Sequence, residues 1–206
     1  MAWKKLEAKT FSSIRELNGI SARTMEEHYE LYKGYIGKVN EIQGKLDTVD
    51  RASANQIYSD LRALRVDLSF ATGGVKNHEV YFAHLGGKGG QPTALLADLI
   101  QRDFGSWDAF VNELKATAMV SRSWVALAYD LSAQRLFLHA SDGPGSPPVW
   151  SSIPLLVLNV SEHAIAADFG RNRMRWIEAC LSNLDWKYVA ENLEAATRTT
   201  GVKTHA

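Results

Sequence analysis

The stretch IPLLVLNVSEHA, residues 153–164, goes furthest in deciding the fold of this chain. Its four central residues, Leu155–Leu158, form an apolar run of the kind that builds a buried strand. Asn159 ends the run, and a carboxylate and an imidazole, Glu162 and His163, follow shortly after it. A side chain placed directly after a buried strand can point into the interface between two parts of a protein. The stretch therefore predicts a core strand that delivers polar groups to an interior site.

Two further strand patterns precede this one. Residues 124–130, WVALAYD, and residues 135–140, RLFLHA, are joined by a short loop and predict a β-hairpin. Helical patterns lie before the hairpin at 92–104 and 106–120, where Ser106 is a candidate N-cap. Two more close the chain at about 171–183 and 186–196. The second half of the chain should therefore pack helices on a small three-stranded antiparallel sheet.

The first half of the chain is helical throughout. Residues 21–46 carry seven apolar or histidine positions at helical spacing: Met25, His28, Leu31, Tyr32, Tyr35, Val39 and Ile42. A second helical run covers about 52–85, and only a few residues join the two, which predicts an antiparallel hairpin. The glycine-rich joint at 86–92 is the expected boundary between domains at 1–88 and 89–206. The fold class is therefore expected to be α+β.

Composition excludes several classes of function. Lys+Arg and Asp+Glu balance at 23 each, so no overall charge favours nucleic acid or an anionic membrane. Cys180 is the single cysteine, which rules out an internal disulfide and a cysteine-built zinc site. The N-terminal residues do not resemble a secretory signal, and no stretch approaches the roughly 20 apolar residues of a bilayer span. We expect a cytoplasmic protein with neither nucleic-acid nor membrane partners.

Three of the six histidines are candidates for a metal site. His84, His139 and His205 are expected at a helix end, on the hairpin surface and in a polar tail. His28, His78 and His163 should face inward from three distant segments, and together they predict one shared ion, although any one alone would be read as a structural histidine. Neutral imidazole suits manganese, iron, cobalt or zinc. No phosphate-binding loop of the order G-x-x-x-x-G-K-[ST] and no G-x-S-x-G nucleophile motif is present.

The ordered motifs of the chain resemble those of the iron/manganese superoxide dismutase family. The resemblance runs from about Ile20 to Leu193 through ISARTMEEHY, NHEVYF, GGQPTALLADLIQRDFGSWDAF, SRSWVAL, IPLLVLNVSEHA and LDWKYVAENL. It implies a helical hairpin and an α/β domain that hold one iron or manganese ion between them, in a dimer or tetramer that dismutates superoxide. By motif matching it places His28, His78, Asn159 and His163 at the four metal-ligand positions. Trp124 matches an active-site tryptophan, and Glu162 matches a glutamate that pairs with the partner subunit's ligand histidine.

Several positions depart from the family pattern, and they cluster around the same site. Asn159 stands where the family has an aspartate, and Tyr32 where it usually has a histidine near the ligands. The active-site tyrosine position falls on Ile36, so that Tyr35, one residue earlier, is the candidate replacement. The glutamine that bonds the metal's solvent is replaced at its two alternative positions, which read Gly74 and Pro144, and Ser161 and Ile165 replace a tryptophan and a tyrosine.

The exchange of aspartate for Asn159 has a predictable electrostatic consequence. A neutral carboxamide is a weaker ligand for a hard ion than a carboxylate. Removal of one negative charge beside the ion should raise its reduction potential and favour the divalent state. Three hypotheses follow: a retuned superoxide dismutase that uses Tyr32 or Tyr35 with Trp124, a divalent-metal protein (zinc included) with a different small-molecule or redox role, and a metal-free structural or partner-binding module. The Glu162–His163 region is the expected contact of a homodimer.

Overall fold

The computed structural model describes residues 4–146 and 149–199, so His205 lies outside the described residues. In chain order the elements are two long helices, two shorter helices, three strands and three helices. Their bounds are α1 Ala22–Thr48, α2 Asp60–Ala83, α3 Ala94–Phe104, α4 Trp107–Val120, β1 Trp124–Asp130, β2 Arg135–Ser141, β3 Ser152–Asn159, α5 Glu162–Phe169, α6 Arg173–Ser182 and α7 Trp186–Thr199. This arrangement confirms the α+β prediction, with a helical N-terminal part and a C-terminal part built on a small sheet.

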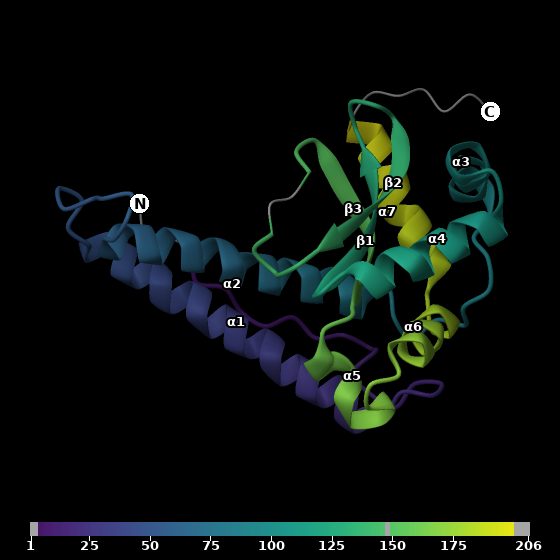
Figure 1. Ribbon diagram of the computed structural model, residues 1–206, viewed down its shortest axis with the longest axis horizontal. Coiled ribbons are helices and arrows are strands. Elements are labelled where there is room, and N and C mark those ends of the chain that lie inside the picture. The colour runs from purple at the N-terminus through teal and green to yellow at the C-terminus, as the bar shows by residue number, and fades with distance from the viewer. Residues whose placement is uncertain (1–3, 147–148, 200–206) are drawn as a thin grey trace.

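Helices α1 and α2 form the expected antiparallel hairpin, which extends well beyond the sheet (Figure 1). Serine hydroxyls cap both N-termini: Ser21 accepts a bond from the backbone N–H of Thr24, and Ser59 from that of Arg62. The second helix begins at Asp60, later than the sequence pattern suggested, because residues 52–58 form an exposed connection in which Ile57 is 83% exposed. The buried positions of α1 run from Thr24 to Leu46, whereas those of α2 lie between Ala71 and Phe82.

Helix α2 continues through Gly73 and Gly74 without a break. A β-carbon at Gly73 would lie 1.9 Å from the carbonyl oxygen of Pro144, and one at Gly74 would lie 2.6–2.7 Å from the ring of Tyr35. Real side chains cannot approach so closely, so these glycines allow a loop and an aromatic ring to pack directly on the helix backbone. The two glycines lower the intrinsic helix propensity of this segment, but the close packing of Pro144 and Tyr35 requires them.

The three strands form one antiparallel sheet in the order β2-β1-β3. Its register places Trp124 opposite Asn159 at one end of the strands, where the Trp124 ring contacts His78 of α2. Helices α3 and α4 pack on β2, and α7 packs on β3 (Figure 1). The sheet thereby fixes the end of β3, from which the chain turns into α5.

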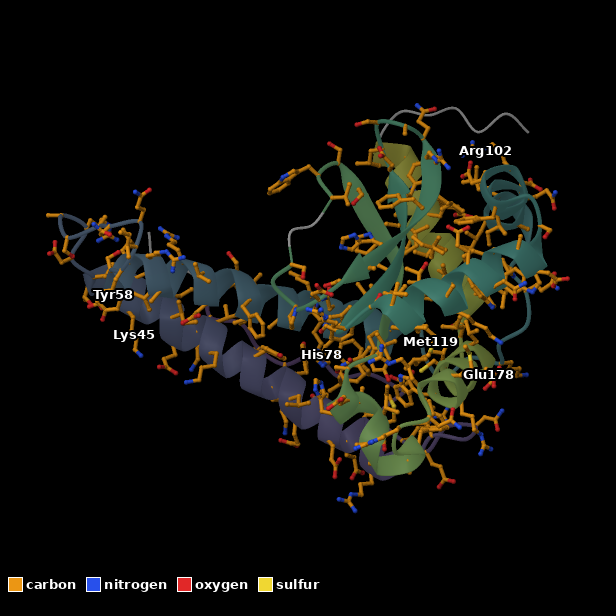
Figure 2. All side chains as sticks on the ribbon, in the orientation of Figure 1. Lys45, Tyr58, His78, Arg102, Met119 and Glu178 are labelled. Carbon is orange, nitrogen blue, oxygen red and sulfur yellow. The ribbon has the colours of Figure 1, made fainter. Side chains whose placement is uncertain are left out.

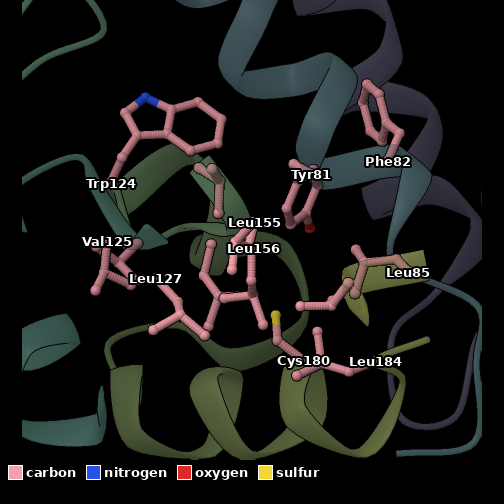
Figure 3. Packing of buried hydrophobic residues seen from close by; sticks show 14 of the residues in the cluster. Tyr81, Phe82, Leu85, Trp124, Val125, Leu127, Leu155, Leu156, Cys180 and Leu184 are labelled. Atoms are coloured by element: carbon pink, nitrogen blue, oxygen red, sulfur yellow. The ribbon is translucent and has the colours of Figure 1, made fainter. Parts of the chain in front are cut away.

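The two parts of the chain share one apolar core (Figure 3). The C-terminal end of α2 contributes Tyr81 and Phe82 to this core, which also contains residues of β1 and β3 and Cys180 of α6. The joint after α2 is held against the turn between α6 and α7, because the backbone N–H of Gly87 donates to the carbonyl of Asn183 at 2.9 Å. The domain boundary at 88/89 falls in this joint and stays a prediction. None of the helices in the described part of the chain has the length and hydropathy that crossing a bilayer requires.

Candidate metal centre

Three histidines from three elements meet where the helical hairpin joins the C-terminal part. His28 comes from α1, His78 from α2 and His163 from the first turn of α5. The centroid of the His28 ring lies 6.5 Å from that of His78 and 6.2 Å from that of His163. Figure 2 shows His78 at the junction, far from Tyr58 at the tip of the hairpin. The structure therefore brings together the three rings that the sequence predicted to converge.

His28 is the most enclosed of the three. It is 1% exposed, and neither ring nitrogen has a hydrogen-bond partner among the described residues. The rings of Tyr81 and Trp176 stand against it at 5.6 and 6.0 Å. Burial lowers the pKa of His28 to about 3, with smaller contributions from His78 and His163, so the ring is neutral at pH 7. A buried polar group without a partner costs about 1–3 kcal/mol, and a bound cation would remove that penalty.

His78 is oriented by a bond to its own helix. Its Nδ1–H donates to the carbonyl oxygen of Gly74 at 2.7 Å, which leaves the lone pair on Nε2. That Nε2 is buried and unpartnered within the described residues. Burial lowers the pKa of His78 to about 4. The centroid of the Trp124 ring lies 4.9 Å from that of the His78 ring, and the two rings are nearly perpendicular, so Trp124 covers one side of His78. The arrangement is that of a metal-ligating imidazole held by a second hydrogen bond.

Asn159, Ser161 and His163 form a continuous hydrogen-bonded chain. The Ser161 hydroxyl donates to Oδ1 of Asn159 and lies 3.0 Å from Nε2 of His163. The backbone N–H of Ser161 also donates to Asn159 Oδ1, at 3.1 Å. The backbone carbonyl of Asn159 accepts a bond from the indole N–H of Trp176 at 2.6 Å. Asn159 is 1% exposed, and its Nδ2 has no partner in the described part of the chain.

The two candidate tyrosines have different environments. Tyr32 is fully buried, and its hydroxyl accepts a bond from the Lys9 backbone at 3.1 Å and lies 3.3 Å from Glu79, so it is directed to the N-terminal segment. Tyr35 is half-buried and rests on Gly74 with its ring 5.6 Å from that of His78. No described residue bonds its hydroxyl. Tyr35 also lines a surface hollow of about 560 Å³ along residues 27–38 of α1, so it borders solvent as well as His78.

The imidazole nitrogens are chemically suited to bind a metal ion, but the three rings are not close enough together to coordinate one in this structure. The described residues contain no group of three or more His, Cys, Asp or Glu side chains close enough to hold an ion as they stand. The buried, unpartnered nitrogens of His28 and His78 are nevertheless the atoms that a cation would satisfy. No carboxylate contributes to the pKa shifts of the three histidines. The centre therefore offers neutral ligands only.

Some residues of the site were missed in the sequence. Trp176 carries an ordinary helical pattern, and only the structure shows that it contacts both His28 and Asn159. His84 lies at the end of α2, as expected, but it is fully buried rather than in solvent, and its Nε2 lies 2.7 Å from the carbonyl oxygen of Val157 on β3. Helix α5 was not predicted because it has only eight residues and no clear apolar period. No local signal marks any of these features.

Comparison with known proteins identifies the family of the chain. Residues 92–192 match the family model of the C-terminal domain of iron/manganese superoxide dismutases. A protein of Aquifex pyrophilus named superoxide dismutase [Fe] is 41% identical over 204 residues, which cover 96% of this chain and 95% of the relative. Its namesake from Aquifex aeolicus is 39% identical with the same coverage. A superoxide dismutase [Mn] 2 of Halobacterium salinarum is 33% identical over 57% of this chain and 59% of its own. The chain belongs to the iron/manganese superoxide dismutase family.

Proposed function

We propose that this chain is a superoxide dismutase that holds one iron or manganese ion through His28, His78 and His163. The observation that supports this most directly concerns His28: its two buried ring nitrogens have no partner among the described residues, and two further neutral imidazoles lie beside it. The chain's relatives include proteins named superoxide dismutase [Fe] and superoxide dismutase [Mn], which supports iron or manganese as the metal.

The chain's own residues would bind the ion and shield it from water. Three neutral imidazoles supply lone pairs, and His78 is held in the right tautomer by Gly74. The rings of Trp124 and Trp176 keep water from two sides of the histidines. A bound ion supplies a one-electron couple, by which one superoxide loses an electron and leaves as O₂ while a second gains it with two protons and leaves as H₂O₂.

Tyr35 is the better supported of the two tyrosines for a role in the reaction. Its ring centroid lies 5.6 Å from that of His78, and the residue also lines a hollow that is open to solvent. Burial raises the pKa of Tyr35, which keeps the phenol protonated and able to donate at neutral pH. Tyr32, by contrast, has its hydroxyl committed to Lys9 and Glu79.

The charge of the site supports a divalent resting state. No carboxylate of the described residues contributes to the pKa shifts of the three imidazoles, so a trivalent ion would be stabilised less than beside an aspartate. This absence also favours a second candidate, a divalent-metal protein without fast dismutation, since three neutral imidazoles suit zinc as well.

A homodimer and a cytoplasmic location complete the proposal. Glu162 and His163 lie side by side on the exposed first turn of α5, and Glu162 pairs with no basic side chain in the described residues. An exposed carboxylate next to a ligand histidine is suited to contact with a second copy. The single cysteine, Cys180, is buried, which is compatible with a reducing compartment.

Metal analysis and a dismutation assay test the function together. Protein loaded anaerobically with Fe²⁺ or Mn²⁺ should retain about one ion per chain and remove superoxide, and His78→Ala should abolish both. His139→Ala is the matched control, because His139 is half-buried on β2 and contacts none of the three histidines. Failure of the wild-type protein to retain stoichiometric metal would refute the proposal. Retention of metal without dismutation would select the second candidate.

A further inference from the structure

Ser161 differs from the other serines that stand at helix N-termini in this chain. Ser21, Ser59 and Ser106 each accept a bond from the backbone N–H three residues later, as a capping serine does. Ser161 stands at the N-cap of α5 but makes no such bond. Its hydroxyl is committed instead to Asn159 and His163. Helix α5 therefore lacks a capping bond that is worth about 1 kcal/mol in other proteins. The Ser161 hydroxyl instead bonds two residues of the candidate site.

The hydrogens in this chain of bonds can be assigned from the chemistry of the groups. A serine hydroxyl has one hydrogen, and it is donated to Oδ1 of Asn159, which has none of its own. Nε2 of His163 must therefore be the donor in its contact with Ser161. In this arrangement the proton on Nε2 occupies the lone pair that a metal would need. Ser161 consequently competes with a metal ion for His163.

The same bonds occupy the amide oxygen of Asn159. A carbonyl oxygen has two lone pairs, and Oδ1 accepts from both the hydroxyl and the backbone N–H of Ser161. Rotation of the amide by a half-turn would set its NH₂ group against the Ser161 backbone N–H, which is only a donor, so Ser161 fixes the orientation. The amide nitrogen lies on the opposite side of the planar group, buried and without a partner among the residues described.

We propose that Asn159 is not a metal ligand in this chain but donates a hydrogen bond from Nδ2 to a small anion held at the three histidines, with Ser161 fixing the amide in that role. This inference rests on the proposed metal centre and specifies what the centre takes. Three neutral imidazoles leave the full charge of a divalent ion uncompensated, so the centre calls for an anion, and Nδ2 is the unused donor at hand. Small monovalent anions fit, with superoxide as the substrate and azide as a stable probe.

Two titrations on the full-length protein test the inference. Mn²⁺ alone is titrated by calorimetry into metal-free wild type, Asn159→Ala, Ser161→Ala and Ser123→Ala, and azide is then titrated into each manganese-loaded protein. Ser123 is the matched control because it is also buried, lies next to Trp124 and makes no side-chain bond to a described residue. Circular dichroism establishes that each variant is folded.

The expected pattern separates a donor from a ligand. Asn159→Ala should bind Mn²⁺ within about threefold of wild type but bind azide roughly tenfold or more weakly, since a bond to a charged group is lost. Ser161→Ala should bind Mn²⁺ about three- to tenfold more tightly, because His163 is released, and azide more weakly, because the amide is no longer fixed. Ser123→Ala should match wild type in both titrations.

Several results would overturn the inference. A tenfold or greater loss of Mn²⁺ affinity in Asn159→Ala would make Asn159 a ligand, and unchanged azide affinity in that variant would remove its role as a donor. If Asn159→Ala does not fold, Ser161→Ala decides: a gain in Mn²⁺ affinity supports the inference, and a loss or no change contradicts it. Absence of Mn²⁺ binding by wild type would defeat the metal centre itself and this inference with it. If the wild type binds Mn²⁺ but the variants do not show the expected pattern of affinities, only the role of Asn159 is refuted, and the metal centre stands.

Discussion

At the scale of single residues, the unusual feature of the site is its lack of charge. An amide occupies the position where the family resemblance implies an aspartate, and the amide is held by a serine that stands where the family has a tryptophan. Two of the three histidines are buried, and burial lowers the pKa of all three, so they are neutral at pH 7. The electrostatic consequence can be measured directly on one side chain.

Asn159→Asp should lower the reduction potential of the metal-loaded protein. One negative charge about 4 Å from an ion is worth about 4 kcal/mol at an effective dielectric constant near 20, which corresponds to a fall on the order of 150 mV for one electron. Mediated redox titration measures the change. Asn40→Asp is the control, because Asn40 lies on α1 twelve residues beyond His28. At 1.5 Å per residue it places the same charge roughly 18 Å from His28. Equal shifts in the two variants would contradict a specific effect at the centre.

The contact between Tyr35 and Gly74 gives a second prediction at this scale. Gly74→Ala places a β-carbon 2.6–2.7 Å from three atoms of the Tyr35 ring, so the ring must move. We expect a loss of about 1–3 kcal/mol in the free energy of unfolding. Gly44→Ala on α1, where nothing lies within 4 Å, should instead gain about 0.5–1 kcal/mol. Urea denaturation measures both variants.

A double-mutant cycle identifies the cause of the loss. If the clash with Tyr35 is responsible, Tyr35→Ala in the Gly74→Ala background should recover most of the lost stability. Additive losses in the double variant would show that the ring is not the obstacle.

At the scale of elements, a buried histidine ties the end of α2 to the sheet. His84 follows α2 directly, is fully buried and contacts the backbone of Val157 in β3. Burial lowers its pKa to about 4, partly offset by the bond to Val157. The connection matters for the site because α2 carries His78 and β3 ends at Asn159. Acid should therefore weaken the contact between these two elements.

The pH dependence of stability tests this connection. The folded pKa of His84 lies below the ordinary value of 6.5, so its contribution is present above pH 6.5 and is lost as the pH falls toward 4. In metal-free protein, His84→Gln should reduce the slope of unfolding free energy against pH in this range by up to about 1.4 kcal/mol per pH unit. Urea denaturation at several pH values between 7 and 4 measures the slope. Identical slopes in wild type and variant would contradict the assignment.

The elements also show how far sequence patterns reach. The three strands and α1, α3 and α4 lie within two residues of their predicted bounds, because each has a clear apolar period and a capping or turn residue. Convergence of His28, His78 and His163 was predicted by their inward positions and by family resemblance. The bonds of Ser161 were not predictable, since a serine at a helix start normally caps the helix. They depend on a tertiary contact with Asn159 and His163 that no spacing encodes.

At the scale of the whole molecule, the site lies between two parts of the chain and near an exposed turn. The N-terminal hairpin supplies two histidines, and the C-terminal part supplies the third through α5. Figure 1 shows α5 beside the first turns of α1. A second copy that covered this turn would bury His163 and complete the enclosure of the site, which is why the oligomeric state bears on the function.

Charge reversal at Glu162 should weaken the proposed dimer. Glu162→Lys removes the carboxylate expected to contact the second copy and should raise the dimer dissociation constant by tenfold or more, measured by sedimentation velocity over a range of concentrations. Asp67→Lys is the control, because Asp67 is exposed on α2 within the hairpin and forms no ion pair with a described residue. A wild-type protein that is monomeric at tens of micromolar would contradict the dimer.

The central claim is that His28, His78 and His163 hold one ion, and anomalous X-ray scattering tests it most directly. Crystals of manganese- or iron-loaded protein, measured on both sides of the absorption edge of the metal, should give one strong anomalous peak per chain within bonding distance of the three imidazoles. Well-ordered crystals with no such peak, or with a peak elsewhere on the chain, would contradict the account.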